Sequence, residues 1–321
     1  MCLVGSLIRS QTCAAFLAKP MQAKTYRGRF APSPSGPLHF GSLLTALGSY
    51  LDAKAQGGEW WLRIDDLDAP RVAPGATDAI LRALEAYGLE WDGAVQYQSH
   101  RSEVYAAALN ALQTLGVVYA CGCSRREISD SSMAGAGAAI YPGTCRDGLA
   151  SGKSARAWRV DTRGAKVRFE DRLQGLIEQN LETTSGDFVV QRADGLFAYQ
   201  LAVVVDDAEL GITDVVRGAD LIDSCLRQVY LYQLLGLEAP RYLHLPVIVN
   251  AAGEKLSKQT LAPALDLDRP QQTIVQALHH LNLAPPRALA RASLKELLDW
   301  AVKYWKPANL PLHRTLEQAS I

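Results

Sequence analysis

The sequence has no excess of charge of either sign, because 33 lysines and arginines balance 33 aspartates and glutamates. This balance excludes a general electrostatic attraction to nucleic acid, so an RNA partner would need a local basic face, for which the basic stretch within residues 125–168 is the candidate. No apolar run approaches the length that spans a bilayer. Neither a Walker P-loop pattern nor the GxGxxG pattern of dinucleotide-binding folds occurs, so these patterns predict no nucleotide site.

Signals for export are also lacking. Residues 1–24 contain apolar patches but neither a basic start nor an unbroken apolar stretch, so they do not resemble a signal peptide. We expect these residues to be a disordered extension, with Met21 as an alternative start, and the protein to be a cytoplasmic monomer. A chain of 321 residues has room for two to three domains with a sizeable core.

A segment near the N-terminus predicts a strand, a turn and a helix in succession. Residues 26–31 predict the strand, a Pro/Ser/Gly run breaks regular structure, and apolar residues at helical spacing follow over 40–56. A helix N-terminus suits phosphate because it offers free N–H groups and the positive end of the helix dipole. Gly36 and Gly41 would let the backbone approach a nucleotide, and His39 adds a donor. Taken alone, a proline-rich loop with a surface histidine explains the segment about equally well.

A pair of lysines follows a second predicted strand, 245–249, and the turn 250–253. Lys255 and Lys258 are three residues apart, so both ammonium groups can face the same way in a helix or tight loop. Two such charges can neutralise the negative charge that develops as pyrophosphate leaves, and a mobile loop can deliver them after ATP binds. A solvated surface pair is the alternative.

Charged and hydroxyl side chains also stand where strands are predicted to end. Arg29 lies on the first strand, Asp65 follows the strand around residues 60–62, Tyr199 closes an apolar segment, and Arg217 closes 211–217. Open α/β sheets bind ligands at such ends. Two arginines can bind carboxylates bidentately and an aspartate can accept from an ammonium, so the set suits an amino acid with a second carboxylate. The alternative is that each residue belongs to a surface ion pair.

The cysteines suggest a metal site more than a disulfide framework. Cys121-Gly-Cys123 is followed, after a polar and glycine-rich stretch, by Cys145, and a cytosolic enzyme rarely keeps disulfides. Three thiols need a fourth ligand to complete a tetrahedron, and no histidine is near. The spacing is not that of a common zinc finger, so three free thiols near a flexible loop remain the alternative.

The glycine-bearing segment near the N-terminus and the later lysine-bearing segment together resemble the signatures of class I aminoacyl-tRNA synthetases. Ala31–Ser42 is similar to the HIGH motif and Lys255–Gln259 to the KMSKS loop, in the family's order. From about Tyr26 to Leu265 the chain resembles the glutamyl branch of that family. The letters His39-Phe-Gly-Ser42 and the final glutamine of Lys-Leu-Ser-Lys-Gln favour the narrower group that attaches glutamate to queuosine in tRNA(Asp).

This resemblance implies a role for each motif residue. Its catalytic residues would be His39, Lys255 and Lys258, and its ATP contacts, with ATP bound as substrate together with Mg²⁺, would be His39, Gly41, Ser42 and Lys258. Glutamate would be held by Arg29, Ser33, Asp65, Tyr199 and Arg217. One structural zinc would be held by Cys121, Cys123, Cys145 and, as an unusual fourth ligand, Tyr141. The family commonly has glutamate where Asp65 stands, so this contact could run through water.

The expected fold class is α/β, with a Rossmann-like parallel sheet as catalytic core, an inserted α+β domain containing zinc, and a C-terminal helical segment. We expect the core over 25–99 and 197–245, the insertion over 100–196, and the KMSKS-like loop and helices over 246–321. Within these ranges the apolar run 197–207 predicts a strand, and the expected helices are 101–115, 221–235, 271–281 and 293–304.

The expected reaction is activation of glutamate by ATP without tRNA, followed by transfer to the cyclopentenediol of queuosine in the anticodon of tRNA(Asp). No anticodon-binding domain is expected after the helical segment, and this favours the queuosine group. Two alternatives stay open. One is a truncated glutamyl-tRNA synthetase that charges tRNA 3′ ends. The other is a catalytically retired relative that binds RNA or an amino acid as a regulator.

Overall fold

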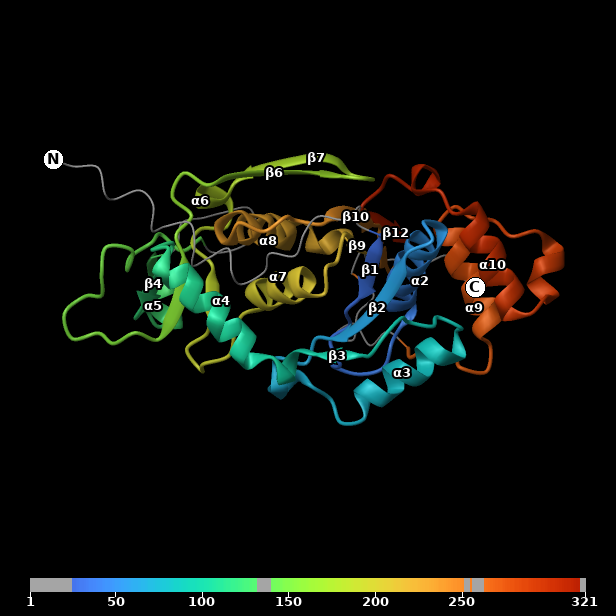
Figure 1. The fold of residues 1–321 in the computed structure, drawn as a ribbon, viewed down its shortest axis with the longest axis horizontal. Helices are drawn as coiled ribbons and strands as arrows, with labels where there is room; N and C mark the ends of the chain where they lie inside the picture. Colours follow the sequence, from blue (N-terminus) through green and yellow to red (C-terminus); the bar gives the residue numbers. More distant parts are fainter. Residues whose placement is uncertain (1–24, 132–139, 251–254, 256–262, 318–321) are drawn as a thin grey trace.

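The centre of the molecule is a parallel sheet assembled from both halves of the chain (Figure 1). The computed structural model describes residues 25–131, 140–250, 255 and 263–317. One parallel sheet has the order β1-β2-β3, formed by Arg27–Phe30, Glu59–Ile64 and Gln96–Tyr97. A second contains the parallel strands β9 (Asp214–Gly218) and β10 (Arg241–Leu245). The two sheets meet along β1 and β9, where the N–H of Thr213 donates to the carbonyl of Arg27 at 2.9 Å. The expected α/β class with a parallel sheet is confirmed.

The range expected for the insertion divides into two parts. The strands β4 (Val118–Cys121), β5 (Ala157–Val160) and β8 (Val189–Gln191) form a separate antiparallel sheet. The hairpin of β6 (Lys166–Asp171) and β7 (Gly175–Asn180) instead extends the central sheet, because β6 pairs in parallel with β10. The boundary drawn at residue 196 therefore does not coincide with the edge of the central sheet.

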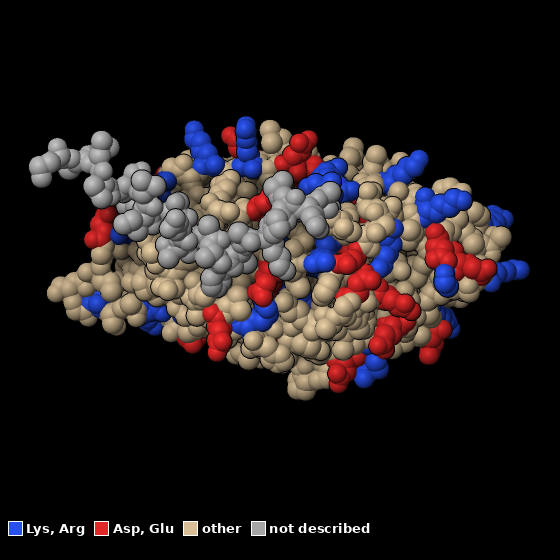
Figure 2. All heavy atoms as spheres, in the orientation of Figure 1, with Lys and Arg blue, Asp and Glu red and all other residues tan. Residues whose placement is uncertain are grey.

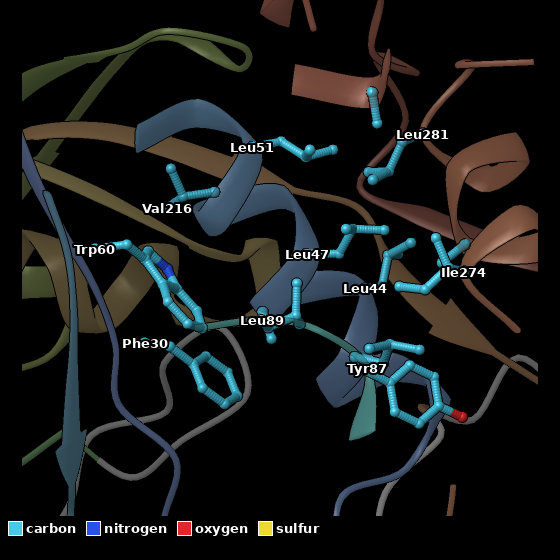
Figure 3. Close-up of a cluster of buried hydrophobic side chains, with 14 of the residues drawn as sticks. Phe30, Leu44, Leu47, Leu51, Trp60, Tyr87, Leu89, Val216, Ile274 and Leu281 are labelled. Carbon is cyan, nitrogen blue, oxygen red and sulfur yellow. The ribbon is translucent and has the colours of Figure 1, made fainter. Parts of the chain in front are cut away.

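Helix α2 (Phe40–Ala55) is the centre of the hydrophobic core. Leu44, Leu47 and Leu51 are fully or almost fully buried, and Figure 3 shows them between Trp60 and Val216 of the sheet and Ile274 and Leu281 of the C-terminal region. The helix can pack this closely because Gly48 faces the sheet: a Cβ there would lie 2.5 Å from Leu245 Cδ1. The helix N-terminus is thereby fixed above the strand ends.

Other helices cover the sheet and extend the molecule along its long axis. The antiparallel sheet with α5 (Arg125–Ser131) lies at one end of this axis, and α9 (Pro270–His280) and α10 (Leu294–Tyr304) lie at the other (Figure 1). Apart from short 3-10 turns, the other helices and strands described are α3 (Ala76–Ala86), α4 (Ser102–Thr114), α6 (Leu181–Thr184), α7 (Tyr199–Glu209), α8 (Ile222–Leu235), β11 (Val247–Val249) and β12 (Thr315–Glu317). None of the described helices is long and apolar enough to cross a membrane.

The predicted strand over 197–207 is wrong, because most of these residues lie in helix α7 (Tyr199–Glu209). Every residue from Leu201 to Asp207 is buried, so the helix has no exposed face and its sequence shows no helical period. Three consecutive valines then favour a strand by propensity, and tertiary burial overrides that preference. The correction matters for the site because it places two adjacent aspartates on a helix.

Candidate functional site

A cavity of about 390 Å³ lies at the carboxyl ends of β1, β9 and β10. Parallel sheets bind ligands at this edge because the loops that follow the strands converge there. Of the residues predicted from the sequence, the cavity brings together Arg29, Ser33, His39, Gly41, Ser42, Tyr199, Arg217 and Lys255. Asp65 does not line it, and Lys258 is outside the described residues. Segments that are far apart in the chain therefore form one site.

The N-terminus of α2 forms one wall of the cavity. His39 is the N-cap, and its Nδ1 accepts a hydrogen bond from the N–H of Ser42 at 3.3 Å. A neutral imidazole that accepts through Nδ1 carries its proton on Nε2, so the opposite nitrogen is a donor. The preceding turn depends on Gly36, whose φ of 146° is rarely adopted by residues with a side chain. The first turn contains no acidic residue, so this helix end suits an anion.

Lys255 approaches the cavity from the other side. Its side chain is 48% exposed, its ammonium donates to Asp220 Oδ2 at 2.5 Å, and its backbone bridges to Val249. A half-exposed ion pair contributes little to stability, so this lysine can exchange Asp220 for another anion at low cost.

A cluster of buried charges lies beneath the cavity, and we call Arg29, Arg63, Asp65, Asp206 and Asp207 the charge cluster. Arg63 is fully buried; its Nε donates to Asp65 Oδ1 at 2.6 Å and its Nη1 to Asp207 Oδ1 at 2.5 Å. Arg29 Nε lies 3.3 Å from both carboxylate oxygens of Asp207. The charge cluster therefore ties the ends of β1 and β2 to helix α7.

Burial and the neighbouring arginines shift the pKa values of Asp207 and Asp65 in opposite directions. Burial opposes the charge on Asp207, but the attraction of Arg29 and Arg63 holds its pKa below the usual value. Burial raises the pKa of Asp65 to about 6, although Arg63 acts in the opposite direction. Because the Asp65 carboxylate is hydrogen-bonded to Arg63, the structure gives Asp65 a role behind the cavity and not on its wall.

Sequence reasoning missed Arg63, Asp206 and Asp207 as members of the site. Asp206 accepts from Gln98, Arg101 and Tyr105, which attaches α7 to the segment that leads into α4. The available signal was the pair of adjacent aspartates inside an apolar run, since buried carboxylates require partners. The strand prediction for that run hid the signal.

Arg217, on β9, is a charged residue of the cavity wall whose hydrogen bonds are incomplete. Its side chain is only 4% exposed, and its Nε donates to His244 Nε2 at 3.1 Å. Nη1 and Nη2 are buried and have no hydrogen-bond partner among the residues that the structure describes. Burial raises the pKa of the neighbouring Cys225 thiol to about 12, so the thiol stays neutral and does not balance the guanidinium charge. Two unpartnered guanidinium nitrogens beside a cavity suit a carboxylate.

The three cysteines predicted as metal ligands do converge. The sulfur atoms of Cys121, Cys123 and Cys145 all lie within 4.8 Å of one another, and Tyr141 Oη is 3.4 Å from the sulfurs of Cys121 and Cys123. In a tetrahedral zinc site with Zn–S bonds of about 2.3 Å, sulfurs are about 3.8 Å apart. The donor set and its spacing therefore fit zinc, at the point where β4 meets the loop leading to β5.

The basic stretch within residues 125–168 is less available to RNA than its composition indicates. Arg146 pairs with Asp187 at 2.5 Å, Lys153 with Glu127, and Arg163 with Asp161 at 2.7 Å. On the face in Figure 2, basic and acidic side chains are interspersed where the surface is not covered by grey atoms. Neither observation identifies a continuous basic surface.

Comparison with known proteins gives one consistent result. The family model for class I tRNA synthetases (E and Q), catalytic domain, matches residues 25–296. A protein from Dechloromonas aromatica named Glutamyl-Q tRNA(Asp) synthetase is 57% identical over 282 residues, covering 87% of this chain and 94% of that protein. A protein of the same name from Pseudomonas aeruginosa is 51% identical over 294 residues, covering 92% of this chain and 98% of that protein.

Solved structures agree on the fold. The glutamate-tRNA synthetase of Elizabethkingia anophelis superposes with a TM-score of 0.77 at 24% identity, covering 92% of this chain and 68% of that one. A glutamate tRNA ligase from Elizabethkingia meningosepticum, solved in complex with its amino acid, gives a TM-score of 0.76 at 25% identity, covering 92% and 67%. At these identities the likeness supports a common fold.

The first prediction concerns the charge cluster. Replacing Arg63 by leucine leaves the buried carboxylates of Asp65 and Asp207 without their shared cation, so the free energy of unfolding should fall by about 3–5 kcal/mol. The control is Arg71→Leu, since Arg71 is 79% exposed and pairs with Asp68 at the surface. This change should stay within about 0.5 kcal/mol. Urea unfolding measures both, and equal stability of the two variants would contradict the structural role of the cluster.

Proposed function

The chain belongs to the family of class I tRNA synthetases for glutamate and glutamine, and we propose that it activates glutamate with ATP in the absence of tRNA and transfers the glutamyl group to the cyclopentenediol of queuosine in tRNA(Asp). Membership makes it a ligase of the aminoacyl-tRNA synthetase type that uses ATP. The choice of queuosine as acceptor is supported by relatives that carry the name Glutamyl-Q tRNA(Asp) synthetase and match more than nine-tenths of their own length.

The observation that supports glutamate most strongly is Arg217. Its two buried Nη atoms have no partner in the described residues and lie beside the cavity, where one carboxylate can satisfy both. Arg29 supplies a second guanidinium, and Ser33 and Tyr199 supply hydroxyl groups at the same cavity. A substrate with two carboxylates matches two arginines. Asp65 contributes indirectly, by holding Arg63 in the charge cluster.

Activation requires a carboxylate oxygen of glutamate to attack the α-phosphorus of ATP, so that a new P–O bond forms and pyrophosphate leaves. The N–H groups at the start of α2 and the imidazole of His39 face the region suited to phosphate, with Gly41 and Ser42 in the first turn. Lys255 and Lys258 would offset the charge that develops on the leaving pyrophosphate, as would Mg²⁺ bound with ATP. In the second step a queuosine hydroxyl attacks the glutamyl carbonyl carbon and AMP leaves.

We assign one structural zinc ion to Cys121, Cys123, Tyr141 and Cys145 in the inserted α+β region. The ion would supply no reaction chemistry. Its ligands come from the end of β4 and from the loop before β5, so binding it would fix a segment that has few hydrophobic contacts of its own. Arg159 stacks on the Tyr141 ring at 4.0 Å and holds that side chain against the sulfurs.

A second candidate function is charging of the tRNA 3′ end with glutamate. It is favoured by the superposition on two proteins named as glutamate-tRNA synthetase or ligase. Both functions share activation of glutamate, so the acceptor nucleotide distinguishes them. A regulator without catalysis is less consistent with a cavity that gathers the predicted activation residues.

The second prediction concerns the acceptor. A tRNA(Asp) anticodon stem-loop that carries queuosine should accept labelled glutamate, and the same stem-loop with guanosine should not, because it lacks the nucleophilic diol. Periodate cleaves vicinal diols, so treating the modified stem-loop should abolish acceptance. Intact tRNA(Glu) serves as the control for 3′-end charging. Glutamate recovered on the terminal adenosine of tRNA(Glu), with none on the stem-loop, would support the second candidate function.

The third prediction concerns the metal. The purified protein should contain about one zinc per chain, and a Cys121→Ser/Cys123→Ser variant should lose it and become sensitive to protease near Tyr141. Cys225→Ser is the matched control, since Cys225 is buried far along the chain from the cluster and should leave the zinc content unchanged. Metal analysis and limited proteolysis give the readouts. Untreated protein without zinc, or with a Cys123–Cys145 disulfide, would remove the assignment.

A further inference from the structure

Three polar side chains form a line across three neighbouring strands of the central sheet. Asp171 is the last residue of β6, His244 lies on β10, and Arg217 lies on β9. His244 and Arg217 are direct partners in the parallel register of β10 and β9. His244 is fully buried and Asp171 is 2% exposed. Burying an imidazole and a carboxylate within a sheet is costly unless each is paired, so the line requires an explanation.

The hydrogen bonds within this line determine where the imidazole proton lies. His244 Nδ1 is 2.6 Å from Asp171 Oδ2, and His244 Nε2 is 3.1 Å from Arg217 Nε. A carboxylate only accepts and a guanidinium only donates, so Nδ1 must carry the proton and Nε2 must accept. Burial lowers the pKa of His244, which keeps the ring neutral and its Nε2 lone pair available to Arg217.

Asp171 is itself fixed in place. Its carboxylate also accepts from the N–H groups of Leu173 at 3.0 Å and Gln174 at 2.8 Å, and from the N–H of His244 at 3.1 Å. With its oxygens held by these backbone groups, Asp171 presents one fixed acceptor to the imidazole. The Arg217 guanidinium also lies over the Tyr242 ring, 5.5 Å from its centroid. The orientation of Arg217 is thus restricted by two contacts.

We propose that His244 is a positioning residue of the amino-acid site: by accepting from Arg217 Nε it turns Nη1 and Nη2 toward the cavity, and Asp171 holds it in the tautomer that can do so. This inference rests on the proposed activation of glutamate. When a guanidinium donates to the protein through Nε, its two Nη atoms remain available to one carboxylate. Arg217 is arranged in this way: Nε donates to His244, and Nη1 and Nη2 have no partner among the described residues. His244 does not line the cavity, so it acts only through Arg217.

The fourth prediction compares three substitutions of His244. In His244→Gln the amide oxygen can occupy the place of Nε2 and accept from Arg217, whereas in His244→Asn the shorter amide reaches the place of Nδ1 and meets only Asp171. His244→Leu makes neither contact. Losing a hydrogen bond to a charged group corresponds to about a 10- to 100-fold change. The KM for glutamate in ATP–pyrophosphate exchange should therefore rise by about that factor in the asparagine and leucine variants and by less than about threefold in the glutamine variant.

The KM for ATP and the melting temperature provide the controls. A general loss of packing would raise both KM values together and would not separate glutamine from asparagine, which differ by one methylene group. Equal glutamate KM values in these two variants, or values that match the wild type in all three, would overturn the proposal. A rise in the KM for ATP parallel to that for glutamate would do the same.

A second measurement does not depend on glutamate. In ¹⁵N-histidine-labelled protein, the resonances missing from the His244→Gln spectrum identify His244, and their shifts report the tautomer. We expect a protonated Nδ1 and an unprotonated, hydrogen-bonded Nε2, and a proton on Nε2 would overturn the proposal. Wild-type protein without glutamate-dependent exchange would refute the proposed function, while the tautomer would still decide whether His244 orients Arg217.

Discussion

The burial of Arg63 between two carboxylates is the constraint on which the site depends. A fully buried guanidinium is stable only with its charge balanced, and Asp65 and Asp207 balance it at 2.6 and 2.5 Å. Asp207 in turn lies against Arg29, so the same helix side chain positions a residue of the cavity wall. The cost of desolvating these charges is offset only in this arrangement, which fixes the ends of β1 and β2 relative to α7.

The buried arginines Arg63 and Arg217 differ in whether the protein itself satisfies their hydrogen bonds. Arg63 has its charge satisfied within the protein and serves the structure, whereas Arg217 has two nitrogens without a partner in the described residues and is the residue that we propose for binding a carboxylate. The end of the cavity proposed for phosphate has a different origin, since the packing of α2 into the hydrophobic core fixes its N-terminus beside the same strand ends. The proposed carboxylate-binding and nucleotide-binding regions are thus supported by separate parts of the molecule that meet at one edge of the sheet.

Local patterns were enough to predict the strand and helix on either side of Gly36, because glycine, proline and helical periodicity act over short distances. The helices α4, α8, α9 and α10 were predicted within a residue or two for the same reason. Helix α7 was not, since a helix buried on every side has no amphipathic period. The contributions of Arg63, Asp207 and His244 also escaped prediction, because their partners come from strands and helices far away in the chain.

The central claim is that this charge arrangement selects an amino acid with a second carboxylate. ATP–pyrophosphate exchange without tRNA tests it most directly, with glutamate, glutamine and aspartate compared as substrates. A site that pairs a charge rejects a neutral isostere strongly, so glutamate should support exchange at a kcat/KM about 100-fold or more above that of glutamine. Aspartate should also be a poor substrate, because its side chain is one methylene shorter and cannot place both carboxylates at the two arginines. Equal exchange with glutamine, or exchange only in the presence of tRNA, would contradict the account.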